Sequence, residues 1–328
     1  MDNKITKKRL SDFLSYEWVV MIIVSVVAIV VWELAYAVGG VKVTVGQEFK
    51  YYYDTSIILE NDNELISNLL EYDTFSYDVL KLGGEVLYEE NNMLADRLSV
   101  QEGDVIFTDT IGLNEYQDEQ KTIPKFVRAK NLIDVYDYRI YSINKMLDDA
   151  TEYAKGFMFD GQPLSKDNID PVKVKACFTK RNGRDNRFRK DYEIAQGLKL
   201  ERKRIEKIID NVEFLTAFIS DPNNESALFR YTRYEQAYHF ADNKEHYSQL
   251  IQKEVQEGRE NSVYGINIGA LKGGLNVSKI MYLSTSTETE IKTDNIVLMA
   301  FDFLTHQPDL QYESLSFICS TIKAFTTP

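Results

Sequence analysis

Cysteine and tryptophan are scarce in this sequence, and each shortage excludes a class of protein. The two cysteines among 328 residues, Cys177 and Cys319, are too few and too far apart for a disulfide framework. We expect two buried thiols, although a single disulfide is possible in an oxidising compartment. No cysteine lies near the apolar N-terminal run, which excludes lipoprotein processing. Both tryptophans, Trp18 and Trp32, belong to that run, so the rest of the chain depends on tyrosine and phenylalanine for large aromatic surfaces.

Motifs for metal and cofactor chemistry are also missing. Of the three histidines, His239 and His246 are seven residues apart, and a metal site needs three or four ligands. The patterns G-x-S-x-G and G-x-x-x-x-G-K-[ST] do not occur, and the pair Gly83-Gly84 is not a phosphate loop. Two acids, Asp104 and Asp109, flank one predicted strand, where acids usually cap the following turn. We therefore predict no enzyme activity, no metal and no cofactor.

A long apolar run is present instead, from Trp18 to Val38. Residues 19–32 carry no charge, and rings at both ends suit the two headgroup layers of a bilayer. The sequence predicts a transmembrane anchor over 18–38, preceded by a cytoplasmic segment 1–17. A buried core helix is the first alternative. A cleaved signal peptide is the second, because Ala35-Tyr36-Ala37 resembles a cleavage site.

Charge around this run predicts the location of the protein. The segment before it contains Lys4, Lys7, Lys8 and Arg9, and basic residues favour the cytoplasmic flank of a membrane span. We expect residues 39–328 to form an extracellular domain of a cell-membrane protein, or a secreted domain if the signal is cleaved. The formal charge of −13 belongs to this part and disfavours nucleic acid as a partner.

Residues 41–109 alternate between strand and helix patterns. The stretch EGDVIFTD, residues 102–109, is typical of a short buried parallel strand, and residues 64–71 are typical of a short helix. This alternation predicts an α/β sheet with right-handed crossovers.

A helical block is predicted from about 133 to 257, with helical spacing at 141–157 and 199–220. Strand character returns at 263–271, and we predict a buried helix over 295–305 and an amphipathic helix over 312–325. The expected domain is two α/β lobes, or one lobe and a helical subdomain, with a cleft between them.

Basic residues concentrate between Lys173 and Lys207, where thirteen Lys and Arg stand against five acids. A solvated helix face explains such a run without function. The functional interpretation is a docking patch for an anionic lipid, a cell-wall polymer or an acidic partner. The residues we assign to partner docking are Lys180, Arg181, Arg184, Arg187 and Arg189.

The order of these parts resembles family 1 extracellular solute-binding proteins of ABC sugar importers. The resemblance rests on the lobe that ends in EGDVIFTD, the helical middle, the return strand VYGINIG and the helical C-terminus. It implies a periplasmic-binding-protein-like α/β fold with a helical middle block. Family members are usually lipoproteins with a longer exported part, and many stack sugars on tryptophan, so this chain would be a degenerate, membrane-anchored relative.

The resemblance implies capture of a small carbohydrate beside ABC permease subunits. Because ligands of open α/β sheets bind beyond the carboxyl ends of strands, we predict that Asp109, Thr110 and Tyr264 line the ligand site. The alternative function is a ligand-free scaffold or regulatory subunit that docks through residues 173–207.

Overall fold

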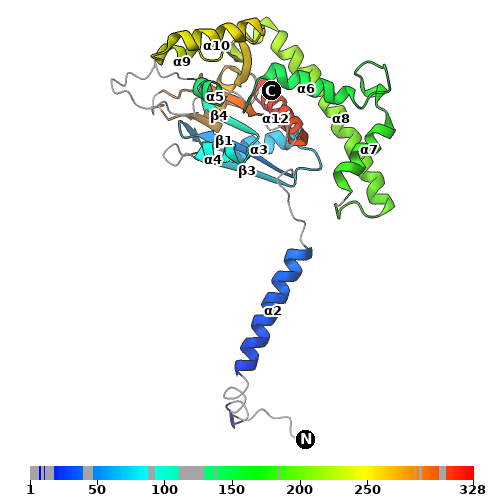
Figure 1. Cartoon of the computed structure of the whole chain (residues 1–328). Helices are drawn as coiled ribbons and strands as arrows, with labels where there is room; N and C mark the ends of the chain where they lie inside the picture. The colour runs from blue at the N-terminus through cyan, green and yellow to red at the C-terminus, as the bar shows by residue number, and fades with distance from the viewer. Residues whose placement is uncertain are drawn as a thin grey trace. The chain divides into compact units, whose positions relative to one another are not determined.

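The structure is a computed structural model, and Figure 1 shows it as a ribbon. It describes residues 7–8, 11, 18–39, 47–87, 93–110, 129–136, 139–183, 185–284, 286–287, 290–302 and 308–328. Of residues 34–39, 236, 240 and 308–311 it describes the backbone alone. The chain divides into two units, Met1–Thr44 and Val45–Pro328.

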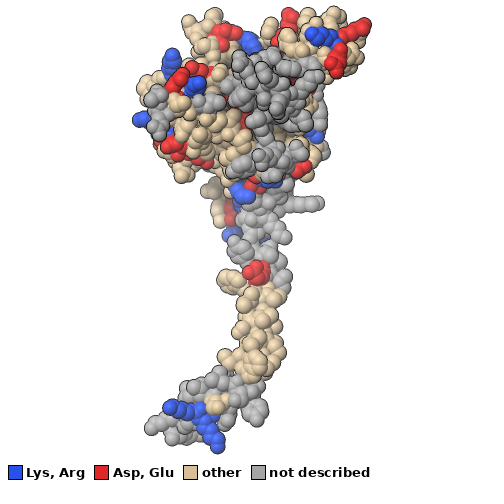
Figure 2. Space-filling view, turned by 90° about the vertical axis from the view of Figure 1, so that its left-hand side faces the viewer, with Lys and Arg blue, Asp and Glu red and all other residues tan. Residues whose placement is uncertain are grey.

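The first unit contains helix α2, Trp18–Gly39. Its described side chains, residues 18–33, are all exposed, and Figure 2 shows its surface as largely uncharged. Among the described residues, no helix combines the length and the apolar character needed to cross a membrane. This finding contradicts the transmembrane helix predicted over residues 18–38.

The second unit is built on a mixed seven-stranded sheet. Its order is β3-β1-β4-β9-β7-β6, and β5 pairs with β9. Strands β1, β3 and β4 are parallel, whereas β9 is antiparallel to β4, β5 and β7, and β6 is antiparallel to β7. The strands are β1 (Glu48–Asp54), β3 (Lys81–Leu87), β4 (Val105–Asp109), β5 (Ile140–Tyr141), β6 (Leu228–Tyr231), β7 (Ser262–Asn267) and β9 (Ile296–Phe301). A separate antiparallel pair joins β2 (Ile57–Leu59) to β8 (Met281–Leu283).

Helices cover both faces of the sheet (Figure 1). One face packs against α4 (Met93–Ser99) and α5 (Ala129–Val135). The opposite face packs against α12 (Pro308–Thr326), which lies beside α8 (Asp191–Ser220). The remaining helices are α3 (Asp62–Glu71), α6 (Ile143–Lys155), α7 (Pro171–Asn182), α9 (Glu235–Phe240), α10 (Lys244–Gln256) and α11 (Val277–Ile280), with short 3₁₀ turns at Lys166–Asn168, Pro222–Ala227 and Ile268–Ala270.

This architecture corrects the predicted periplasmic-binding-protein-like organisation. Residues 45–328 form one compact unit rather than two lobes. The predicted helical block, residues 133–257, contributes β5 and β6 to the same sheet, because their backbones pair with β9 and β7. The fold is therefore mixed α/β with strands and helices interleaved through the whole unit.

The helix predicted over 295–305 is wrong, because residues 296–301 form strand β9. A continuous apolar run fits a buried helix and a buried strand equally well. Here the run lies between β4 and β7, where its backbone groups are hydrogen-bonded on both sides. The pattern of residues 75–80 also predicts a strand, and this prediction is wrong as well, since β3 begins at Lys81.

Strand β1 shows how closely both faces are packed. Tyr51 and Tyr53 point to one face and Tyr52 to the other, as the period of a strand requires, and all three are at least 96% buried. A buried hydroxyl needs a partner, and the α3 carboxylate of Asp62 accepts from Tyr51 at 3.0 Å and from Tyr53 at 2.8 Å. Gly84 in β3 makes room for the Tyr51 ring, which a Cβ at that position would meet at 2.5 Å.

Candidate functional site: a polar groove beside β7

A large polar groove lies at the N-terminal end of β7. Its volume is about 710 Å³, within the range of about 300–1,000 Å³ typical of small-molecule sites. We call it the β7 groove. It is lined by Ile140, Ser142, Asn144, Lys145, Asp148, Asp149, Arg230, Arg233, Glu257, Gly258, Arg259, Glu260, Asn261, Ser262, Tyr264 and Asp302.

The start of α6 forms one wall of the β7 groove. Ser142 is the N-cap of this helix, and its hydroxyl accepts from the backbone N–H of Lys145 at 3.3 Å. Asn144 is fixed against β7, because its Oδ1 accepts from the backbone N–H of Val263 at 3.2 Å. The segment that carries Arg230 and Arg233 and the turn at residues 257–261 supply further lining residues.

Charges of both signs line the groove in almost equal number. Four are cationic and five are anionic among the lining side chains. Lys145 Nζ lies 2.7 Å from Asp149 and 3.3 Å from Asp302. Burial alone would lower the pKa of Lys145, but hydrogen bonds to these carboxylates raise it. Lys145 therefore stays charged at neutral pH and supplies a fixed donor.

Tyr264 is the predicted ligand residue that lies in this groove. It is 1% exposed, and the guanidinium of Arg233 lies 5.5 Å from the centre of its ring. Burial is the main reason that the pKa of Tyr264 is raised, so its hydroxyl stays protonated. Tyr264 therefore forms the floor beneath Arg233 and offers little open surface for stacking.

Asp109 and Thr110 lie elsewhere. Gly265 and Ile106 both pair with Met299, so these two residues lie level with one another across the sheet. Tyr264 precedes Gly265 by one residue and Asp109 follows Ile106 by three, so Tyr264 and Asp109 lie four strand positions apart. That is roughly 13 Å along the strands. Asp109 is 1% exposed at the carboxyl end of β4, and Thr110 Oγ1 bonds Asn295 Oδ1 at 3.1 Å. The structure does not bring the three predicted ligand residues into one site.

The arginines that line the groove were missed in the sequence. Residues 229–234 read FRYTRY, in which arginine alternates with aromatic side chains, and this pattern was the available signal. Arg259 is further along the chain, in the turn after α10, and its Nη2 donates to Glu254 Oε1 at 2.6 Å. Only the pairing of β6 with β7 brings these segments together.

The predicted docking residues fall into different environments. Lys180 and Arg189 are exposed, and Arg189 donates to the Asn186 side chain. Arg181 has 11% of its side chain exposed and pairs with Asp78, and Arg187 also pairs with Asp78, at 3.4 Å. Arg184 lies outside the described residues. Two of the five cations thus serve internal contacts rather than a free surface.

Arg181 belongs to a buried cluster that we call the Glu201 network. Its members are Tyr77, Asp78, Arg181, Glu201 and Arg204. Glu201 is fully buried and accepts from Tyr77 Oη at 2.6 Å, Arg181 Nη1 at 2.8 Å and Arg204 Nη2 at 2.9 Å. Burial alone would raise the pKa of Glu201, but Arg204 and Arg181 lower it to about 2. The network links α7 and α8 to the segment before β3.

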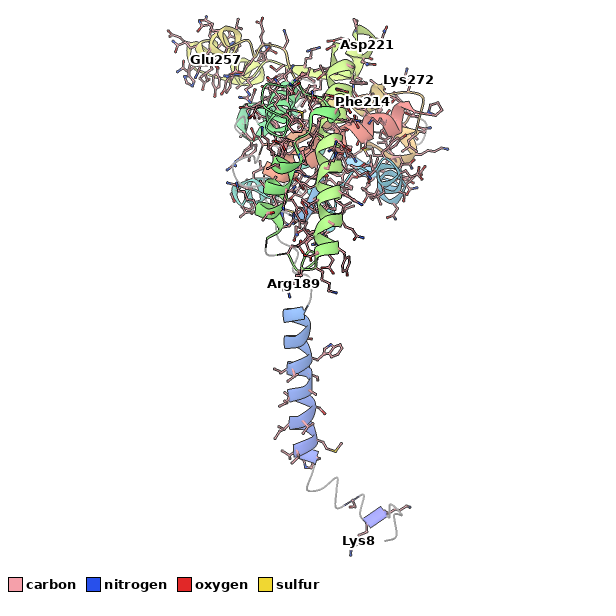
Figure 3. The ribbon with its side chains drawn as sticks, turned by 90° about the vertical axis from the view of Figure 1, so that its right-hand side faces the viewer. Lys8, Arg189, Phe214, Asp221, Glu257 and Lys272 are labelled. Atoms are coloured by element: carbon pink, nitrogen blue, oxygen red, sulfur yellow. The ribbon has the colours of Figure 1, made fainter. Side chains whose placement is uncertain are left out.

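The predicted docking region and the β7 groove lie apart in Figure 3. Arg189, near the start of α8, and Glu257, after α10, lie far apart on the second unit, and α7 lies beside α8. Docking at the predicted cations and binding in the β7 groove would therefore use different surfaces. Neither cysteine is in a disulfide: Cys177 is half-buried and Cys319 is buried, and both are free thiols.

Among the residues with described positions, no group of three or more His, Cys, Asp or Glu could hold a metal ion. No protein-family model, no curated protein and no solved structure matches this chain.

Asp104, just before β4, is a buried acid. It is 8% exposed and accepts from the backbone N–H of Lys50 at 2.7 Å. Burial is the main cause that raises the pKa of Asp104 to about 8, and the nearby carboxylate of Glu313 adds to the shift. The folded protein therefore holds Asp104 protonated under conditions that ionise it in the unfolded chain.

This pKa predicts a pH dependence of stability. The folded pKa lies above the unfolded one, so the contribution of Asp104 is fully present below about pH 4 and is lost as the pH rises to about 8. The substitution Asp104→Asn keeps an acceptor for Lys50 and cannot ionise. We expect its free energy of unfolding, relative to the natural protein, to improve by about 3 kcal/mol between pH 6 and pH 9. Urea unfolding across this range measures it.

The exposed Asp242 provides the control for this experiment, because Asp242→Asn removes the same charge without touching a buried site. Parallel pH profiles for Asp104→Asn and the natural protein would contradict the assignment.

Proposed function

We propose that this protein binds a small polar solute, rich in hydroxyl groups, in the β7 groove. The observation that carries the proposal is the groove of about 710 Å³, in which most of the lining residues are polar or charged. Small-molecule sites are usually lined mostly by apolar side chains. A lining of this kind favours a ligand that makes hydrogen bonds over most of its surface.

The balance of charges narrows the ligand class. A strongly ionic solute would meet as much repulsion as attraction from four cations and five carboxylates. A sugar hydroxyl both donates and accepts, so it can bond carboxylates and guanidinium groups in the same site. Asn144 and Asn261 add amide donors and acceptors. A neutral carbohydrate therefore fits this lining better than an ion or an apolar molecule.

Delivery of the solute to an ABC permease and an extracellular location stay predictions from the sequence. We do not retain the scaffold function as a second proposal, because Arg181 and Arg187 are engaged inside the fold. The groove is a different surface, so solute binding does not depend on that region.

The test is a carbohydrate binding panel on the purified full-length chain, kept in mild detergent because the apolar side chains of α2 are exposed. A ligand that binds the native state raises the melting temperature by mass action. Arg230 lines the groove, and its Nε lies 2.7 Å from Glu225. We expect Arg230→Ala to weaken binding by about tenfold or more, the loss of a charged hydrogen bond of roughly 1.5–3 kcal/mol, and to leave the stability of the free protein almost unchanged.

The matched control is Arg202→Ala. Arg202 also forms a surface pair, with Glu206 at 2.8 Å, but it lies on α8 outside the groove. Equal affinity in the two variants, or a panel without any shift, would reject the proposal.

A further inference from the structure

A second, smaller cavity lies between α8, α12 and the segment before β3. Its volume is about 70 Å³, and it shares no lining residue with the β7 groove. Such a space admits a few heavy atoms and excludes a sugar or a nucleotide. The residues that line it are Asp73, Phe75, Ser76, Tyr77, Leu200, Lys203, Arg204, Lys207, Ile208, Asn211, Tyr312, Glu313 and Ser316.

Nitrogen donors from α8 form one row along this cavity. Lys203, Lys207 and Asn211 are spaced four residues apart, so their side chains lie on one helix face, and all three line the cavity. Arg204, 4% exposed, adds a third cation on the neighbouring face. Two lysines at this spacing repel one another, which costs stability unless an anion lies between them.

Asn211 provides an independent observation. It is 3% exposed, and its Nδ2 has no hydrogen-bond partner in the described part of the chain. An unsatisfied buried donor costs about 1–3 kcal/mol, so such a group usually faces a ligand or ordered water. Lys207 is half-buried, and its Nζ lies 3.4 Å from the carbonyl oxygen of Tyr72, a long hydrogen bond. Burial lowers the pKa of Lys207, a cost that a bound anion would offset.

The two acids in the lining do not exclude an anion. Asp73 pairs with Lys203 at 2.6 Å, and both are more than half exposed. Glu313 is buried and accepts from the Ser76 backbone N–H at 3.0 Å. Burial raises the pKa of Glu313, so it loses its charge at a higher pH than an ordinary glutamate does.

We infer that this cavity binds a tetrahedral oxyanion of the phosphate class, held by Lys203, Lys207 and the Asn211 amide. Such an anion would accept from the amide and lie between the two like charges. Because it would bind the folded chain and not the unfolded one, it would stabilise the folded chain by mass action.

The test measures phosphate binding to the full-length chain by calorimetry, with chloride at equal ionic strength as the reference. We expect Asn211→Asp, which places a negative charge in the donor row, to weaken the affinity by about tenfold or more. Lys207→Gln should do the same, and it serves as the second variant if Asn211→Asp does not fold. Lys199→Gln is the control, because Lys199 is exposed on α8 and does not line the cavity.

Two arms distinguish the source of the phosphate group. Inorganic phosphate should bind more tightly than glycerol 3-phosphate, because the cavity has no room for the glycerol moiety. Tighter binding of the ester would overturn the free-ion assignment.

Phosphate also stabilises proteins generally by exclusion from their surface, and that effect would raise all melting temperatures alike. The proposal would be overturned if phosphate raised the melting temperature of the natural protein and of the Asn211 and Lys207 variants equally. It would also be overturned if calorimetry detected no heat of phosphate binding to the natural protein.

Discussion

Replacing Glu201 by glutamine is expected to lower the free energy of unfolding by about 3–5 kcal/mol, the cost of breaking a buried ion pair from one side. The carboxylate is fully buried and accepts from Tyr77, Arg181 and Arg204. The glutamine keeps the volume but leaves Arg204, whose side chain is 3% exposed, without its charge partner on α8. Urea unfolding at neutral pH measures the loss.

The pH dependence of this loss follows from the same network. The folded pKa of Glu201 is about 2 and the ordinary value is 4.5, so the carboxylate's contribution is present above pH 4.5 and is lost as the pH falls toward 2. The difference between Glu201→Gln and the natural protein should therefore shrink in acid. Glu206→Gln is the control, since Glu206 lies on the same helix in a partly exposed pair with Arg202 and should cost about 0–1 kcal/mol. Equal losses at the two positions would contradict the role of the network.

Replacing Phe317 by alanine is expected to cost about 3–5 kcal/mol, because it empties a site at the centre of the core. Phe317 is fully buried on α12, between the sheet and α8. Its ring centre lies 5.3 Å from that of Phe49 and 6.1 Å from those of Tyr51 and Phe107. Neighbouring rings cannot all move to fill the space, since strand pairing fixes β1 and β4.

Phe159→Ala is the matched control, because that ring is 46% exposed and its removal leaves no internal cavity. We expect it to cost about 1 kcal/mol or less. Phe317→Leu should lie between the two, since it retains most of the buried volume. A loss under about 1 kcal/mol for Phe317→Ala would show that the α12 interface is loosely packed.

Several elements could be predicted from periodicity. The spacing of isoleucines and leucines in 199–220 predicted the body of α8, and DVIFTD predicted β4. The transmembrane assignment of residues 18–38 did not agree with the structure, in which no described helix is long and apolar enough to cross a membrane. The amphipathic helix predicted over 312–325 is helical but is buried on nearly every side. Its polar side chains bond within the fold: Glu313 accepts from the backbone N–H of Ser76, and Ser316 donates to the carbonyl oxygen of Thr74.

The sequence by itself determined local structure: the apolar run of α2 and the body of the long helix α8. Only the tertiary structure decided that Ile296–Phe301 is a strand, because the backbone pairing to β4 and β7 is not encoded in local pattern. The β7 groove is equally non-local, since Lys145, Arg230 and Arg259 meet only after three segments pack together. The same holds for the basic run at 173–207. The sequence suggested that Arg181 is a surface charge, but in the fold it is buried and pairs with Asp78 and Glu201.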